Sequence, residues 1–229
     1  MGARSITPAF GDPAFEEQLA RYHFALSSAK EKTALDIGCG MGFGTCALAT
    51  AAFLVTGVDA DEDQLKFARA NYKHPHVDYV RDDLATLSGV RKKFDLACAF
   101  GVLERLERPA YEKFIRSVCS HLYPTGTAIF SAGRDVISPE ELKSFCAKYF
   151  CEVQMLGQMK NRGFVSNMLT RWGLAGSGRA AQESPFRFEP LMYWRPEVGW
   201  GESEKFVFAP TLWKKTDSLI AVCRVPKVL

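Results

Sequence analysis

The residues best suited to chemistry in this 229-residue chain are aspartates placed beside apolar runs and a cluster of glycines. Asp36 lies in the apolar run 33–37, and Gly38, Gly40 and Gly42 follow at once. Such a run, broken by closely spaced glycines, predicts a buried parallel strand, a tight turn and the start of a helix. Because glycine has no Cβ, a ligand can approach the main chain closely there. The stretch 33–45 therefore predicts a cradle for a small molecule.

The residues around the glycines help to decide which ligand this cradle binds. The dinucleotide pattern G-x-G-x-x-G needs a small residue where this chain has Phe43. A phosphate-binding loop needs a Lys followed by Ser or Thr after its last glycine, and no Lys occurs between Lys32 and Lys66. Both phosphate-binding hypotheses are weakened.

Two carboxylates point to a cationic ligand instead. We expect Asp36 at the strand end to repel a pyrophosphate and to attract a ligand that carries an ammonium and a sulfonium group. S-adenosylmethionine has both cations, and its own carboxylate can bind the free amides at a helix start. Asp59 ends the next apolar run, 53–58, where a carboxylate can accept both ribose hydroxyls and would exclude a 2'-phosphate.

With these residues identified, the chain resembles the class I S-adenosylmethionine-dependent methyltransferases over about residues 21–150 and again at its last strand. Four blocks carry the resemblance: Leu35-Asp-Ile-Gly-Cys-Gly-Met-Gly42, Gly57-Val-Asp-Ala60, Val80-Arg-Asp-Asp-Leu84 and Phe94-Asp-Leu-Ala-Cys-Ala-Phe-Gly-Val-Leu-Glu-Arg-Leu106. The resemblance implies an α/β, Rossmann-like, doubly wound fold: a mostly parallel, seven-stranded sheet with an antiparallel last strand and an insertion before it. It also implies an enzyme that uses S-adenosylmethionine and releases S-adenosylhomocysteine.

The same resemblance suggests which residues bind the cofactor. Arg21 pairs with the methionine carboxylate, or else is a solvated surface residue. Asp83 aligns best with the acidic side chain that accepts from the adenine amine, and Asp82 is the alternative; the following amide, of Leu84, donates to the ring. The full expected set is Arg21, Asp36, Gly38, Gly40, Gly42, Asp59, Ala60, Asp83, Leu84 and Phe100.

The catalytic group is less well defined by the sequence. Phe100, Gly101 and Glu104 follow the predicted strand 94–100, at the edge where open α/β sheets bind ligands. Many relatives in the resembled family have Glu-His where this chain has Glu104 and Arg105, and that His is often proposed as the base. Arg105 cannot be the base, because a guanidinium stays protonated. Glu104 or a residue from the C-terminal part is the candidate base, and Arg105 either holds an anionic acceptor or is a surface residue.

Length and composition predict a single domain, 1–229, and the resemblance implies that it is a methyltransferase domain. An apolar fraction of 47% is ordinary for a globular protein, and a net charge of +3 gives no argument for nucleic acid. Seven cysteines without a C-x-x-C pair predict neither a disulfide framework nor a metal site. No apolar run approaches the length of a membrane span, and the N-terminus lacks a signal-peptide core. We expect a cytoplasmic enzyme whose partner is a small-molecule acceptor, with no nucleic acid and no membrane.

Two segments frame the predicted core. Asp12 and Pro13 predict the start of a helix over 13–30, which the resemblance places over the cofactor site. Residues 157–216 form the predicted insertion. It holds all four tryptophans, Trp172, Trp194, Trp200 and Trp213. Aromatic and basic side chains there suit an acceptor site and equally a homodimer contact.

The acceptor is predicted from the resemblance alone. The Arg21-Tyr22 pattern and the block 100–106 resemble methyltransferases of bacterial surface-polysaccharide clusters, which implies O-methylation of a saccharide or nucleotide-linked sugar. A quinone, another aromatic compound or an amine is the alternative acceptor, because ubiquinone-pathway methyltransferases share the block 94–106. Two other classes stay open: a non-catalytic protein that binds S-adenosylmethionine, suggested by the missing His, and a nicotinamide oxidoreductase.

Overall fold

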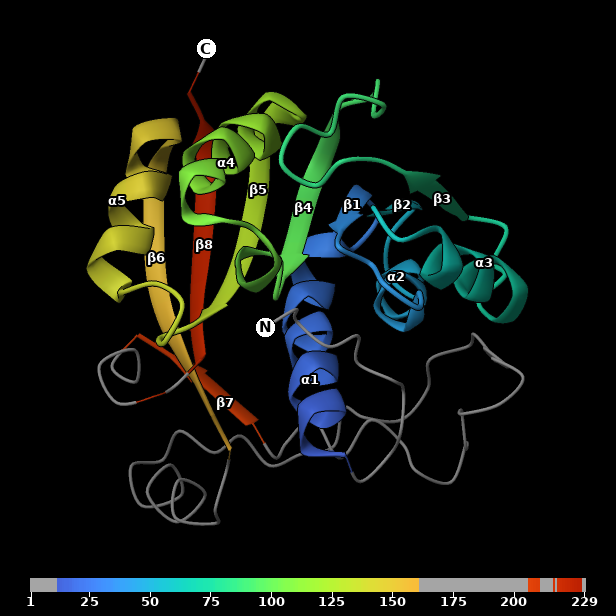
Figure 1. The fold of residues 1–229 in the computed structure, drawn as a ribbon, viewed down its shortest axis with the longest axis horizontal. Helices are drawn as coiled ribbons and strands as arrows, with labels where there is room; N and C mark the ends of the chain where they lie inside the picture. Colours follow the sequence, from blue (N-terminus) through green and yellow to red (C-terminus); the bar gives the residue numbers. More distant parts are fainter. Residues whose placement is uncertain (1–11, 161–205, 211–215, 217, 228–229) are drawn as a thin grey trace.

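A single twisted sheet runs through the part of the chain that this computed structural model describes, residues 12–160, 206–210, 216 and 218–227. The strand order is β3-β2-β1-β4-β5-β8-β6-β7 (Figure 1). The parallel strands are β1 (Thr33–Ile37), β2 (Leu54–Asp59), β3 (Val77–Arg81), β4 (Phe94–Phe100) and β5 (Leu122–Gly133). The antiparallel pairs involve β6 (Phe150–Lys160), β7 (Phe206–Ala209) and β8 (Ser218–Pro226).

The sheet confirms the doubly wound, mostly parallel fold with an antiparallel last strand, but it has eight strands and not the predicted seven. The additional strand is β7, which pairs antiparallel with the end of β6, Gly157 opposite Ala209. Both paired segments fall inside the predicted insertion 157–216, so its two ends join the sheet. The four tryptophans lie outside the described residues, and the predicted role of the insertion stays a prediction.

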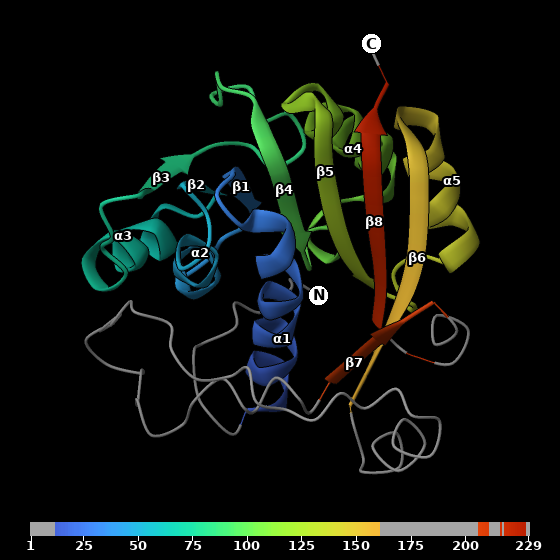
Figure 2. The same cartoon turned by 180° about the vertical axis from the view of Figure 1, so that it is seen from behind.

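Helices cover both faces of the sheet (Figures 1 and 2). The α-helices are α1 (Pro13–Ala29), α2 (Phe43–Ala49), α3 (Glu62–Asn71), α4 (Tyr111–Ser120) and α5 (Pro139–Tyr149), and two 3-10 turns are η1 (Leu103–Arg105) and η2 (Arg108–Ala110). Side chains alternate along β4: Leu96, Cys98 and Phe100 pack in the core that includes α1 and α2. Ala97 and Ala99 pack in the core that includes α4 and α5. No helix in the described ranges is long and apolar enough to span a membrane.

The helix starts follow from local sequence. The side chain of Asp12 accepts from the amide of Ala14 at 2.8 Å, and Pro13 takes the first helical position of α1, as predicted. Asp61 caps α3 by accepting from the Asp63 amide at 2.9 Å. Satisfying the free amides of the first turn fixes where each helix begins.

The strand order creates a crevice between β1 and β4. The chain leaves β1 toward β2 on one side, whereas β4 leads to β5 on the other. Open α/β sheets bind ligands beyond the carboxyl ends of the strands at such a switch point. The glycine turn follows β1 and the segment 101–105 follows β4, so both border this crevice.

Candidate active site

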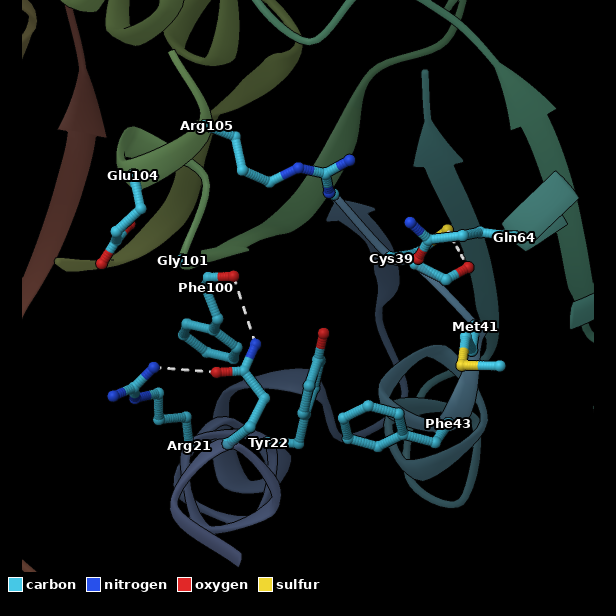
Figure 3. A pocket seen from close by; sticks show the side chains of 13 residues that line it. Arg21, Tyr22, Cys39, Met41, Phe43, Gln64, Phe100, Gly101, Glu104 and Arg105 are labelled. Carbon is cyan, nitrogen blue, oxygen red and sulfur yellow. Dashed lines mark hydrogen bonds between the residues drawn. The ribbon is translucent and has the colours of Figure 1, made fainter. Parts of the chain in front are cut away.

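A pocket of about 240 Å³ opens at the carboxyl ends of β1 and β4, beside α1 (Figure 3). Its lining combines segments that are far apart in the sequence. Helix α1 contributes Gln18, Arg21 and Tyr22; the glycine turn and the start of α2 contribute Gly38, Cys39, Gly40, Met41 and Phe43; α3 contributes Gln64; the end of β4 and η1 contribute Phe100, Gly101, Glu104 and Arg105. Of the predicted cofactor residues, Arg21, Gly38, Gly40 and Phe100 lie in this lining.

The glycines of the turn have two different roles. Gly38 and Gly40 border the pocket with φ angles of 73° and 53°, in the left-handed region that favours glycine. Gly42 also has a positive φ, 90°, but it is not in the lining. A Cβ there would lie 2.7 Å from both Ala68 Cβ and Tyr79 Oη. Its missing side chain makes room for α3 and β3, and the predicted ligand contact of Gly42 stays a prediction.

Asp36 lies beneath the pocket and not in its wall. Its side chain is fully buried, and its two oxygens accept from Tyr22 Oη at 3.1 Å and from Thr45 Oγ1 at 2.7 Å. Desolvation raises the pKa of this carboxyl to about 7, although the two hydrogen bonds oppose the rise. Tyr22 from α1 donates to this carboxyl group, and the expected contact of Asp36 with a cationic ligand stays a prediction.

Asp59 ends β2 as predicted, and its carboxylate is fully hydrogen-bonded. Oδ2 accepts from the Gly40 amide and from Arg105 Nη1, both at 2.9 Å. Oδ1 accepts from the Asp61 amide at 3.0 Å and from Arg105 Nη2 at 2.9 Å. The pairing with Asp59 raises the pKa of Arg105 above its ordinary value, so the guanidinium keeps its charge. No sequence signal indicated this ion pair.

Arg21 reaches the pocket from α1 and is held by neighbouring polar groups. Its Nε donates to Gln158 Oε1 at 2.7 Å, and its Nη1 donates to Gln18 Oε1 at 2.8 Å. Its Nη2 forms an ion pair with Glu17 and donates to Ser218 Oγ. This network fixes the guanidinium at the pocket wall, and its predicted pairing with the methionine carboxylate stays a prediction.

Aromatic rings form one wall of the pocket. The Tyr22 ring packs edge-to-face against Phe43 and Phe100, with centroid distances of 5.7 and 5.0 Å. Phe43 is thus a pocket-wall residue. Gln18, which the sequence analysis missed, donates from Nε2 to the Phe100 carbonyl at 3.2 Å. The available signal was a polar residue one helical turn before Tyr22, on the buried face of α1.

Glu104 lines the pocket beside Gly101 (Figure 3). Its Oε1 accepts from the amide of Gly133, the last residue of β5, at 2.9 Å. Its Oε2 is buried and has no hydrogen-bond partner among the residues that the structure describes. A buried carboxylate oxygen without a donor is unusual, since the loss of hydration is not offset.

The predicted adenine-binding residues follow β3, outside the pocket lining. Asp82 organises this loop, because its Oδ2 accepts from the amides of Gly89 at 2.7 Å and Val90 at 3.2 Å. Asp83 is exposed and accepts from Thr86 Oγ1 at 2.8 Å. Ala60 is also exposed, whereas the Leu84 side chain is only 5% exposed and packs in the core. These adenine contacts stay predictions.

The chain is similar in sequence to known methyltransferases. Residues 34–126 match the family described as "Methyltransferase domain". The ubiquinone biosynthesis O-methyltransferase of Coxiella burnetii is 26% identical over 165 residues, which cover 71% of this chain and 70% of that protein. The enzyme of the same name from Rickettsia canadensis is 32% identical over 99 residues, covering 42% of this chain and 41% of that protein.

Solved structures share the fold at low sequence identity. The N-methyltransferase NodS from Bradyrhizobium japonicum, solved with S-adenosyl-L-homocysteine, superposes with a TM-score of 0.61 at 16% identity, covering 98% of this chain and 94% of that one. A TehB-like methyltransferase from Corynebacterium glutamicum gives a TM-score of 0.55 at 17% identity, covering 91% and 87%. The matched family spans the glycine turn, the carboxylate of β2 and the end of β4. Residues 34–126 are thus a methyltransferase domain, and the fold is the one found in S-adenosylmethionine-dependent methyltransferases.

Proposed function

We propose that this methyltransferase methylates a hydroxyl oxygen of a small molecule. The observation that carries the proposal is the pocket at the switch point between β1 and β4, bordered by Gly38 and Gly40 and placed beside the carboxylate that ends β2. The open main chain of the turn and the amide-anchored Asp59 fit an adenosyl ligand. In this arrangement Asp59 takes the ribose, Arg21 faces the methionine carboxylate, and the loop after β3 takes the adenine.

The residues at the other end of the pocket would position the acceptor. The bound cofactor supplies a methyl carbon attached to a positively charged sulfur, which is open to in-line displacement. Phe100, Gly101 and Glu104 come from the end of β4 and face this end of the pocket. Holding a nucleophile close to the reacting carbon contributes much of the acceleration in such a reaction.

Glu104 is the proposed proton acceptor. When a hydroxyl oxygen forms its bond to carbon, the hydroxyl proton must leave, and a nearby base assists this step. The Gly133 amide holds Oε1 in place, which leaves Oε2 to take the proton. None of the residues that line the described pocket is a histidine, so Glu104 is the one carboxylate or imidazole in the lining that fits this role.

The weak base favours an acidic hydroxyl as the acceptor. A phenolic or enolic hydroxyl loses its proton more readily than an aliphatic sugar hydroxyl, so a carboxylate suffices. The related proteins named as ubiquinone biosynthesis O-methyltransferases support an aromatic acceptor of this kind. The saccharide or nucleotide-linked sugar expected from the sequence has no comparable support, and it serves as the competing substrate class in the test.

Two assays test this proposal, first for cofactor binding and then for methyl transfer. S-adenosylhomocysteine and NAD are compared by thermal unfolding, where a ligand at about 100 times its Kd contributes nearly 3 kcal/mol of stability. We expect S-adenosylhomocysteine alone to stabilise the protein. Methyl-labelled cofactor is then offered with a catechol and with a uridine diphosphate sugar, and label should pass to the catechol. Stabilisation by NAD would remove the methyltransferase proposal, and label on the sugar alone would remove the aromatic acceptor.

A matched pair of glutamate variants tests the base. Glu104→Gln should lower kcat about 100-fold, the usual scale for losing a general base, and leave the Kd of S-adenosylhomocysteine unchanged. The control is Glu107→Gln, because Glu107 lies three residues further along the chain, is exposed and is not in the pocket lining. Equal rates in the two variants would leave Glu104 a structural residue.

A further inference from the structure

Arg105 lies in the part of the site where the proposed cofactor would bind. It comes from η1, 46 residues along the chain from Asp59, and it crosses the pocket toward the glycine turn (Figure 3). Both of its terminal nitrogens donate to Asp59, each at 2.9 Å. A Cβ built on Gly38 would lie 3.6 Å from Arg105 Nη1. The guanidinium therefore covers both the carboxylate and the first glycine of the cradle.

The carboxylate of Asp59 has no acceptor position to spare in this arrangement. A carboxylate offers about four lone-pair sites. Two of them are taken by the backbone amides of Gly40 and Asp61, and two by Arg105. A ribose diol needs two acceptor sites. It can be bound by Asp59 only if two of the present donors leave.

The donors differ in how readily they can move. The Gly40 amide belongs to the turn and the Asp61 amide to the capped start of α3, so moving either one would disturb the backbone. The Arg105 guanidinium ends a long side chain that is 27% exposed. Its backbone is anchored by the neighbouring Leu103, which is 1% exposed. The side chain can therefore swing aside while η1 stays in place.

We propose that Arg105 competes with the ribose of the bound cofactor for Asp59: it closes the ribose subsite in the ligand-free protein and moves away when the ribose hydroxyls replace its two N–H donors. This inference rests on the proposed function, because it assumes an adenosyl ligand at Asp59. Breaking a charge-assisted, bidentate bond consumes part of the free energy of binding. Arg105 thus lowers the affinity for the cofactor, although it lines the pocket.

The test is a set of S-adenosylhomocysteine affinities measured by isothermal titration calorimetry. Arg105→Met removes the donors and keeps a long, unbranched side chain. We expect its Kd to fall about 3- to 10-fold below that of the wild type, because a partly exposed ion pair no longer has to be broken. The matched control is Arg108→Met, since Arg108 lies in η2, pairs with Glu141 and is not in the lining. Its Kd should stay within about twofold of the wild type.

Two further variants connect the effect to Asp59. Arg105→Lys keeps the charge but not the fork of donors, so its Kd should lie between those of wild type and Arg105→Met. In an Asp59→Asn background, Arg105→Met should bring no further gain, because the ion pair is already absent. Circular dichroism and the unfolding temperature confirm that each variant is folded.

The outcomes separate this inference from the proposed function. An unchanged or higher Kd in folded Arg105→Met would overturn the competition, even if the wild type binds S-adenosylhomocysteine well. An equal gain in the Asp59→Asn background would also overturn it, since the effect would not pass through that carboxylate. Failure of the wild type and of every variant to bind S-adenosylhomocysteine would overturn the proposed function itself.

Discussion

Asp36 and Asp59 lie at the ends of adjacent parallel strands, and the fold treats them in opposite ways. Both side chains are 0% exposed. Asp36 is closed in by two neutral hydroxyl groups, from Tyr22 on α1 and Thr45 on α2. Asp59 is bound by two backbone amides and by the guanidinium of Arg105. Among the described residues, no cation is bonded to Asp36, whereas Arg105 forms an ion pair with Asp59.

This difference shows that a position at a strand end does not decide what a carboxylate does. Because nothing positively charged is bonded to Asp36, desolvation dominates and raises the pKa of that carboxyl to about 7. Its hydrogen bonds tie α1 and α2 to β1, so it organises the floor of the pocket. Asp59 is instead paired with the guanidinium of Arg105. Partners from distant parts of the sequence thus give the two carboxyl groups different surroundings.

The largest predicted difference between Asp36 and Asp59 is in how each affects the pH dependence of stability. Asp36 has a folded-state pKa of about 7, against an ordinary value of 3.8. Its contribution to the stability of the folded protein is therefore fully present below about pH 4 and is lost as the pH rises to about 7. The free energy of unfolding should fall over that window by up to about 4 kcal/mol, at about 1.4 kcal/mol per pH unit. Asp36→Asn should remove this slope.

Urea unfolding at about pH 5 and about pH 8 measures that slope directly. Asp63→Asn is the control, because it makes the same change of charge at an exposed aspartate that pairs only with Lys66 in the described structure. This control should retain the wild-type slope. An Asp36→Asn variant that loses stability with pH as steeply as the wild type would mean that Asp36 is not the titrating group.

A change at Gly44 should open the floor around Asp36 by displacing Tyr22. A Cβ at Gly44 would lie 1.9 Å from Cζ of the Tyr22 ring, which is sterically impossible without movement. Gly44→Ala normally favours a helix, yet here overpacking should destabilise the protein by about 3 kcal/mol. The control is the same change in a Tyr22→Ala background, where the space is free and the cost should vanish. A similar cost in both backgrounds would show that the Tyr22 ring is not what Gly44 accommodates.

For Asp59, the second of the two aspartates, the change Asp59→Asn should weaken the binding of S-adenosylhomocysteine. Losing a charge-assisted acceptor costs about 1.5 to 3 kcal/mol, so the Kd of S-adenosylhomocysteine should rise about 10- to 100-fold. Asp63→Asn again serves as the control, and its Kd should match the wild type. Calorimetric titration measures both. An unchanged Kd in Asp59→Asn would remove this carboxylate from the ligand site.

Local patterns in the sequence predicted the parts of the molecule that depend on near neighbours. Asp12 caps α1 as expected, because an N-cap is fixed by residues two or three positions away. Asp59 was assigned to the end of β2 because the strand is a short apolar run. The four-residue strand β7 was missed, since it lies in a segment without a repeating pattern and is defined by its pairing with β6.

The roles of side chains in the site depend on contacts that the sequence pattern does not contain. Asp36 was predicted to face a ligand, and only the packing of α1 brings Tyr22 over it. The pairing of Arg105 with Asp59 joins residues 46 positions apart. The sequence shows only that Arg105 cannot act as a base. Its ion pair with Asp59 is visible only in the structure.

Tyr22→Phe gives the smallest predicted effect and tests whether the hydroxyl partners of Asp36 act on its charged form. Tyr22 Oη donates to Asp36 Oδ1 at 3.1 Å, and this bond lowers the pKa of Asp36 against the rise caused by burial. Removing it should cost about 1 kcal/mol above pH 7, where the carboxylate is charged, and less at about pH 5. The loss of stability with rising pH should also continue to a higher pH than in the wild type.

Tyr79→Phe is the matched control for this change. Tyr79 is also buried, but its Oη donates to the backbone carbonyl of Tyr72 at 3.2 Å, which does not titrate. Its cost should therefore be the same at both pH values, as measured by urea unfolding. If Tyr22→Phe behaves like Tyr79→Phe, the hydroxyl of Tyr22 contributes only packing and a neutral hydrogen bond. The contrast between the two aspartates would then rest on the desolvation of Asp36 alone and not on its hydroxyl partners.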